Sequence, residues 1–136
     1  MRQSKKRGGE LVGKLTILAV DDDREILSSF MQILSKHGYG VETAETGHEA
    51  IEKCKSGSYD LALLDIKLPD MDGTQLLEQL QEIEPKMRTI MVTGYAGLDG
   101  ALRSLILHAN AYVQKPVDPD ELLKVVRATL NEQQIE

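Results

Sequence analysis

Residues 61–73 of the chain, LALLDIKLPDMDG, decide the fold. They begin with the apolar run Leu61 to Leu64, which ends abruptly in the carboxylate of Asp65. A strand with one face in solvent alternates apolar and polar residues, whereas a strand of a parallel sheet covered on both faces is apolar throughout. The stretch therefore predicts a central strand of a parallel sheet that delivers an acidic side chain at its end.

Strand-like runs alternate with helix-like segments five times along the chain. The predicted strands are residues 15–20, 40–44, 59–64, 88–92 and 111–114. Such alternation requires right-handed crossovers between parallel strands, and the connecting helices then cover both faces of the sheet. The sequence thus predicts an α/β fold, a (βα)5 doubly wound open sheet.

The helix-like segments carry recognisable start and stop signals. Their apolar periodicity predicts helices over residues 24–36, 73–83 and 119–131. Three aspartates are candidate N-caps of these helices, namely Asp23, Asp72 and Asp118. Gly38 is a candidate C-cap of the first helix, and Pro69 with Asp70 is expected to form the turn before the second. His48 and Glu49 are expected to face solvent.

Composition limits the classes of protein that the chain can belong to. It has 136 residues, 41% of them hydrophobic and 28% charged, which indicates one globular domain. Residues 1–14 hold five cationic side chains and one acid, a balance of +4, so the remaining 122 residues carry −10 of the net charge of −6. This acidic body argues against a nucleic-acid partner, and residues 1–14 are expected to be a flexible basic tail.

Cysteine usage and hydropathy indicate where the protein works. A lone Cys54 excludes an internal disulfide. The apolar run LTILAV is too short for an export signal or a membrane span, and Asp21 follows it at once. We therefore expect a cytoplasmic protein without a membrane partner.

Polar side chains follow four of the predicted strands. They are Asp21 and Asp22, Asp65, Thr93 and Lys115. The carboxyl ends of parallel strands meet at one edge of a doubly wound sheet, so these side chains are expected to lie together. Three carboxylates in one place repel one another, and a hard divalent cation such as Mg²⁺ relieves that cost. Thr93 and Lys115 would then suit an anionic phosphoryl group beside the metal.

Four segments at these strand ends, AVDDD, LLDIKLPDMDG, MVTGY and YVQKPVD, resemble the signature segments of the receiver domain of two-component response regulators. The resemblance covers residues 15–131, leaving residues 132–136 as a frayed end or the start of a linker. It implies a flavodoxin-like sheet of five parallel strands in the order 2-1-3-4-5. It also implies that Asp65 accepts a phosphoryl group from a histidine kinase or a histidine phosphotransfer protein.

A metal site follows from the same resemblance. Asp21 and Asp22 would hold Mg²⁺ together with Asp65, and the backbone carbonyl of Lys67 would complete the protein ligands. Mn²⁺ could substitute for Mg²⁺. The domain would modify itself and slowly lose the modification, so it would not be an enzyme in the ordinary sense.

The resemblance further implies a switch. Thr93 would hydrogen-bond the phosphoryl group, and Lys115 would form an ion pair with it. Tyr112 matches the aromatic residue that turns inward as Thr93 moves, and the bond to Pro116 matches the family's cis peptide, which aims the ammonium into the site. Residues 97–131 would form the surface that changes, contacts an output domain or target protein, and is a candidate homodimer surface.

Two large residues bracket the candidate acceptor. Lys67 lies two residues after Asp65, and Tyr95 lies two residues after Thr93. We expect them to hinder the water that hydrolyses an acyl phosphate and so to prolong the phosphorylated state. The alternative is that both side chains point into solvent.

Other readings of the acidic cluster fit the sequence less well. A phosphohydrolase of the haloacid dehalogenase type needs a second acid two residues after the nucleophile, where this chain has Lys67. A calcium loop over DIKLPDMDGTQL lacks the glycine at its sixth position and has Leu76 in place of the final glutamate. A pseudo-receiver that acts only through protein contacts remains the alternative function. The sequence leaves open whether the domain stands alone or belongs to a longer regulator.

Overall fold

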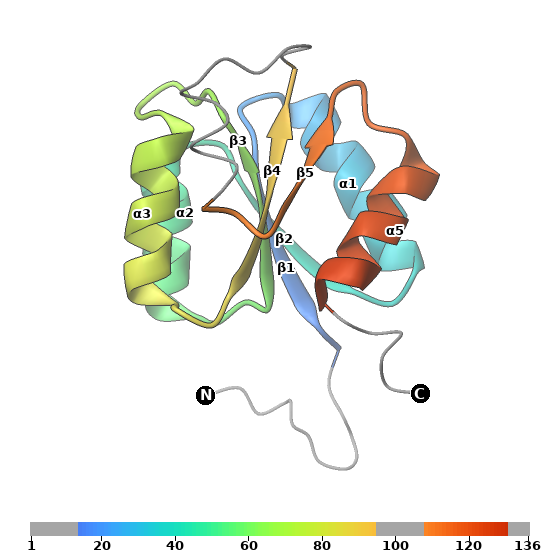
Figure 1. Cartoon of the computed structure of the whole chain (residues 1–136), viewed down its shortest axis with the longest axis horizontal. Coiled ribbons are helices and arrows are strands. Elements are labelled where there is room, and N and C mark those ends of the chain that lie inside the picture. Colours follow the sequence, from blue (N-terminus) through green and yellow to red (C-terminus); the bar gives the residue numbers. More distant parts are fainter. Residues whose placement is uncertain (1–13, 95–107, 131–136) are drawn as a thin grey trace.

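The computed structural model describes residues 14–94 and 108–130. Five parallel strands form one sheet in the order β2-β1-β3-β4-β5, as predicted (Figure 1). The strands are β1 (Thr16–Val20), β2 (Gly40–Ala44), β3 (Leu61–Asp65), β4 (Arg88–Thr93) and β5 (Ala111–Gln114). The order reverses between β1 and β3, so the carboxyl ends of these two strands flank the topological switch point of the sheet.

Helices cover both faces of the sheet, which confirms the doubly wound architecture. The described helices are α1 (Arg24–Lys36), α2 (Gly47–Ser56), α3 (Gly73–Ile83) and α5 (Pro119–Leu130). Helices α2 and α3 lie on one face, and α1 and α5 lie on the other (Figure 1). Each pair closes its own hydrophobic core against the sheet.

The central strand β3 explains why its sequence lacks polar alternation. All five of its residues are buried. Leu61 and Leu63 pack toward α1 and α5, whereas Ala62 and Leu64 pack toward α2 and α3. Since both faces of the strand contact apolar side chains, neither face tolerates a polar residue before the strand ends at Asp65.

Both predicted ends of β3 differ from the structure, and β1 begins and β4 ends one residue later than predicted. Strand β3 begins at Leu61 rather than at residue 59, because the side chains just before it are bound to neighbouring strands. Tyr59 donates its hydroxyl to Glu42 Oε1 at 2.8 Å, and Asp60 Oδ2 accepts the backbone N–H of Thr16 at 2.8 Å. At the other end, β3 extends to Asp65, which pairs with Val92. The candidate acceptor therefore belongs to the sheet ladder itself.

Helix ends follow the predicted capping signals. The Asp23 carboxylate accepts the backbone N–H groups of Glu25 and Ile26, and Asp72 forms a capping box with Gln75. The Asp118 carboxylate accepts the N–H of Glu121 at 3.0 Å. The C-cap of α1 is His37, one residue before the predicted Gly38; Gly38 follows with a φ of 95°, in the left-handed region that glycine adopts without strain. These caps are local interactions, which is why the sequence predicts them.

Helix α2 is the element that the sequence marks least clearly. Its residues GHEAIEKCKS are mostly polar, and four of them are buried: Gly47, Ala50, Ile51 and Cys54. The Thr46 hydroxyl caps the helix by accepting the N–H of Glu49 at 3.0 Å. Burial, with a smaller contribution from Glu84, raises the pKa of Cys54 to about 11, so the thiol stays neutral and packs as a small apolar group.

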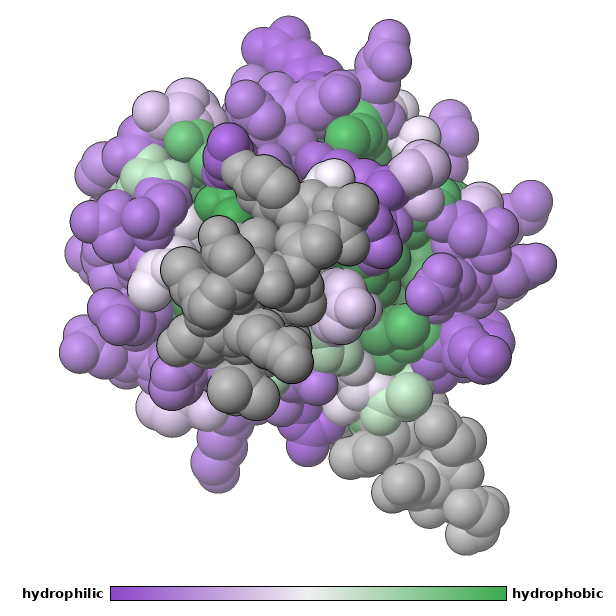
Figure 2. Space-filling view, turned by 45° about the horizontal axis from the view of Figure 1, so that its top comes forward, coloured by the Kyte–Doolittle hydropathy of each residue, from purple (hydrophilic) through white to green (hydrophobic). Residues whose placement is uncertain are grey.

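The surface agrees with the polar composition of the chain. The face in Figure 2 is mostly hydrophilic, with hydrophobic patches between the charged side chains. Among the described residues, no helix is long and apolar enough to cross a membrane.

Candidate functional site

Four strands bring the predicted site residues to one edge of the sheet. Asp21 follows β1, Asp65 ends β3, Thr93 ends β4 and Lys115 follows β5. A cavity of about 400 Å³ opens at this edge and is lined by Asp22, Asp65, Ile66, Lys67, Thr93, Gly94 and Lys115. The side chains that the sequence predicted to meet therefore do meet.

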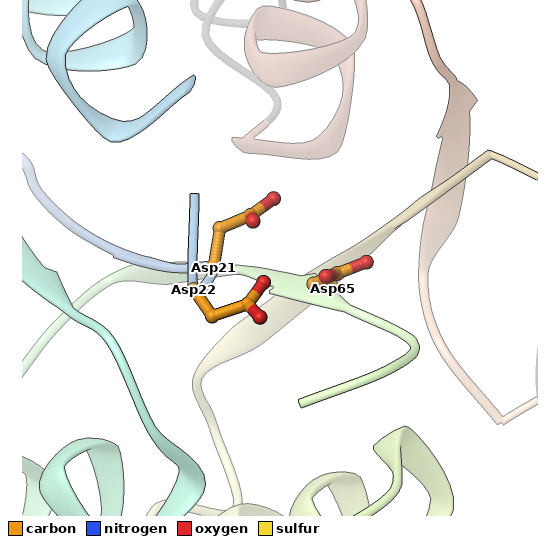
Figure 3. Close-up of side chains that lie close together, drawn as sticks. All are labelled: Asp21, Asp22 and Asp65. Atoms are coloured by element: carbon orange, nitrogen blue, oxygen red, sulfur yellow. The ribbon is translucent and has the colours of Figure 1, made fainter. Parts of the chain in front are cut away.

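Three carboxylates form the centre of the site. Asp21, Asp22 and Asp65 each offer an oxygen, and these oxygens lie within 4.8 Å of one another (Figure 3). Asp21 is 1% exposed and Asp65 is 8% exposed, whereas Asp22 is open to solvent. The backbone N–H of Asp23 donates to Asp21 Oδ1 at 2.9 Å, which fixes that carboxylate. Two of the acids are thus buried, and the third faces the solvent.

Lys115 supplies the positive charge nearest to the buried acids. Its Nζ lies 3.0 Å from Asp21 Oδ2 and 3.5 Å from Asp65 Oδ1. One ammonium against three carboxylates leaves a local charge of −2. Burial and the charge of Asp21 raise the pKa of Asp65, and Lys115 opposes that rise. Burial alone would lower the pKa of Lys115, but the two carboxylates raise it, so this side chain stays an ammonium.

The donor set fits a hard divalent cation. Carboxylate oxygens are the ligands that Mg²⁺ prefers, and the uncompensated charge of the cluster matches its own charge. Asp21 Oδ2 is buried, and its ion pair with Lys115 brings one cation to a cluster of three carboxylates. Burying carboxylates that outnumber the cations around them destabilises the fold unless a further cation completes their environment. Lys115 meets part of that need, and the remaining negative charge favours a metal.

The structure also places three other predicted site residues, Thr93, Tyr112 and Pro116. Thr93 is fully buried at the end of β4, and its carbonyl accepts the backbone N–H of Lys115 at 2.6 Å. Tyr112 lies on β5 with 43% of its surface exposed. The peptide bond between Lys115 and Pro116 is cis, as expected. Tyr95 and residues 97–107 lie outside the described residues.

The sequence did not reveal the role of Asp70. Predicted only as part of a turn, this residue caps the N-terminus of α2: its carboxylate accepts the backbone N–H groups of Gly47 and His48, each at 2.9 Å. It also contacts Nδ1 of His48, which is exposed as expected. Partial desolvation by itself would raise the pKa of Asp70. The hydrogen bonds from Gly47 and His48 outweigh this effect and lower the pKa of Asp70 to about 2. No local pattern could have indicated this partnership, because the partners lie 22 and 23 residues away in the sequence.

Comparisons with known proteins agree with one another. The family model of the response regulator receiver domain matches residues 17–127. The cell cycle response regulator CtrA of Brucella ovis is 33% identical over 114 residues, which cover 84% of this chain and 49% of CtrA. The chain spans about half the length of the curated relatives that it matches.

Solved structures show the same relationship. A CheY-like receiver domain from Methanospirillum hungatei JF-1 is 48% identical with a TM-score of 0.82, covering 90% of this chain and 98% of that one. CheY from Borrelia burgdorferi, solved in a CheX-CheY-BeF3-Mg²⁺ complex, is 28% identical with a TM-score of 0.79, covering 86% of this chain and 90% of that one. The family model, the relatives, the order of the strands and the acidic edge of the sheet all lead to the same conclusion. The chain belongs to the receiver domain family of two-component response regulators.

Proposed function

We propose that the chain is a phospho-acceptor domain, in which Asp65 takes a phosphoryl group from a histidine kinase or a histidine phosphotransfer protein. One observation carries the proposal: a buried carboxylate at the end of the central strand, with two further acids and Lys115 in contact range. The strand fixes Asp65 in position, and the cavity beside it leaves room for a donor group.

The reaction forms one bond and breaks another. An oxygen of the Asp65 carboxylate attacks phosphorus, and a P–O bond forms as the P–N bond of the donor phosphohistidine breaks. The bonding electron pair leaves with the imidazole nitrogen, and Asp65 becomes an acyl phosphate. Lys115 pairs with the transferred group in place of the lost carboxylate charge, and Thr93 hydrogen-bonds one of its oxygens. The Lys115 ammonium and the Thr93 hydroxyl, which take these roles, belong to residues that line the same cavity.

The acidic side chains would hold the metal that this transfer requires. Asp21, Asp22 and Asp65, with the backbone carbonyl of Lys67, are the proposed ligands of Mg²⁺, and Mn²⁺ would be an adequate substitute. When bound, the ion supplies positive charge to the phosphoryl oxygens. Two findings support this assignment: the donor set of the three acids, and the presence of Mg²⁺ in the solved complex of the Borrelia relative.

Phosphorylation would be read out at a surface away from Asp65. We assign the receiver domain to residues 15–131, with 1–14 as a basic tail and 132–136 as an end or linker. Movement of Thr93 toward the phosphoryl group would draw Tyr112 inward from its exposed position and alter the surface of residues 97–131. An output domain, a target protein or a second copy of the chain would bind that surface.

Intact-mass measurement tests the proposal. The full chain is incubated with acetyl phosphate, which is a small phosphoryl donor, in the presence of Mg²⁺ or of excess EDTA. We expect a gain of one phosphoryl group with Mg²⁺ and none with EDTA. A folded chain that gains nothing in either condition would instead favour a pseudo-receiver that works through surface contacts alone.

Lys67 is expected to prolong the phosphorylated state. It is exposed and lines the cavity next to Asp65, where we propose that it hinders the water that attacks the acyl phosphate. Lys67→Ala should shorten the lifetime several-fold, and Tyr95→Ala should act in the same direction. The decay is followed by intact mass after the donor is removed. Lifetimes equal to the wild type in both variants would assign both side chains to solvent.

A further inference from the structure

The loop between β3 and α3, residues 66–72, is tied to the N-terminus of α2. Asp70 makes both hydrogen bonds of this tie, to the backbone N–H groups of Gly47 and His48. Bonds from N–H groups to a carboxylate are charge-assisted, and the positive end of the helix dipole strengthens them further. The low pKa of Asp70 agrees with a carboxylate that is held in this way.

A second contact locks the same two segments together. Gly47 is buried beneath the side chain of Met71, and a Cβ atom at Gly47 would lie only 2.6 Å from Met71 Cγ and Sδ. The loop therefore rests on the helix backbone at a position where no larger residue fits without displacing Met71. Asp70 and Met71 together form what we call the α2 latch.

The loop is also closed at its base. The backbone N–H of Gly73 donates to the carbonyl of Ile66 at 2.7 Å, and the backbones of Lys67 and Asp72 pair in an isolated antiparallel β-bridge. Lys67, whose carbonyl is the proposed fourth protein ligand of the metal, belongs to this base and lies three residues before Asp70 of the α2 latch. Its backbone position thus depends on contacts at both ends of the loop.

We infer that Asp70 is a positioning residue for metal binding: by holding the loop against α2 it holds the carbonyl of Lys67 at the acidic cluster. This inference rests on the proposed function. Groups that orient metal ligands without touching the metal typically contribute 10-fold to 100-fold to metal affinity. A loop released from its anchor must be ordered again each time that the metal binds, so the affinity falls.

A purely structural role is the competing explanation, because Asp70 also caps α2. Thr46 provides a matched control, since its hydroxyl caps the same helix by accepting the N–H of Glu49, a hydrogen bond that does not involve the loop. His48→Ala is a second control: it removes the side-chain contact with Asp70 and keeps the backbone N–H donor. If Asp70 did no more than cap α2, Asp70 and Thr46 variants should change the Mg²⁺ affinity by the same amount.

The test is calorimetric titration of the full-length chain with Mg²⁺, well below the melting temperature of each variant. We expect Asp70→Ala to weaken the Mg²⁺ affinity about 10-fold, and Asp70→Asn, which keeps one acceptor oxygen, to restore part of the loss. Thr46→Ala and His48→Ala should stay within about twofold of the wild type, even where Thr46→Ala lowers the melting temperature. Circular dichroism verifies that each variant is folded.

Two results would overturn the inference. One is an unchanged Mg²⁺ affinity in folded Asp70→Ala, and the other is an equal loss in Asp70→Ala and Thr46→Ala. If Asp70→Ala does not fold, Met71→Ala takes its place, because it loosens the α2 latch by packing alone; a wild-type affinity there would overturn the inference too. A wild-type chain that binds no Mg²⁺ would contradict the proposed function itself. The two failures are distinguishable, because the inference about Asp70 fails only where the wild type binds Mg²⁺.

Discussion

Asp65→Asn is expected to abolish phosphoryl uptake. The carboxamide that replaces the carboxylate has nearly the same shape, but its oxygen is a poor nucleophile and its nitrogen presents a donor to the incoming group. Intact mass after incubation with acetyl phosphate and Mg²⁺ measures the effect. Wild type should gain one phosphoryl group, and the variant should gain none.

Asp60→Asn is the matched control for this loss. Asp60 precedes β3 at the opposite end of the strand and binds Thr16 rather than the acidic cluster. Its variant should therefore be phosphorylated like the wild type. Uptake of a phosphoryl group by Asp65→Asn would place the acceptor at another residue.

Asp65→Asn should also be more stable than the wild type when no metal is present. The pKa of Asp65 is raised in the folded protein, so the ionised carboxylate disfavours the folded state increasingly as pH rises through that pKa. Removing the charge is expected to add about 1 kcal/mol to the free energy of unfolding at neutral pH. Urea unfolding should show this gain at neutral pH and a smaller one in acid, where Asp65 is protonated. This result would also demonstrate that loss of uptake is not loss of fold.

Lys115→Ala should slow phosphoryl transfer by about 100-fold, the typical effect of removing one group that stabilises charge in a transition state. The ammonium lies 3.5 Å from the acceptor carboxylate and lines its cavity. No other lysine or arginine in the described residues lines that cavity apart from Lys67. The rate of mass gain at saturating Mg²⁺ measures the effect.

Mg²⁺ affinity separates this role of Lys115 from general damage to the site. Removing the ammonium raises the local negative charge, so Lys115→Ala should bind Mg²⁺ more tightly while it reacts more slowly. Lys124→Ala, on the exposed surface of α5, should change neither quantity. Equal transfer rates in Lys115→Ala and wild type would remove Lys115 from the mechanism.

Much of this site could be predicted because its residues are placed by the regular repeat of the fold. Once LALLD is identified as a strand buried on both faces, Asp65 must lie at the carboxyl edge of the sheet, where the ends of the neighbouring strands also lie. Local caps such as Asp23 were equally accessible, because donor and acceptor are two or three residues apart. These predictions were correct because the fold repeats regularly and because the capping partners lie close together in the sequence.

Asp70 and α2 could not be predicted in the same way. The hydrogen bonds of Asp70 join segments that are distant in the sequence, and the polar composition of α2 gives a weak periodic signal. The start of β3 was predicted too early for a related reason. Tyr59 suits a strand by composition, but its hydroxyl binds a side chain of β2, and Asp60 binds the backbone of β1. Such tertiary contacts are specified by packing, which a single sequence does not display.

The most direct test of the account locates the phosphoryl group. The chain phosphorylated with acetyl phosphate and Mg²⁺ is treated with borohydride, which reduces an acyl phosphate to an alcohol, and the modified residue is then found by peptide mass spectrometry. We predict that the reduced side chain is Asp65 and no other. Reduction at a different residue, or a phosphoryl group that resists borohydride because it is carried on a hydroxyl or an imidazole, would contradict the account.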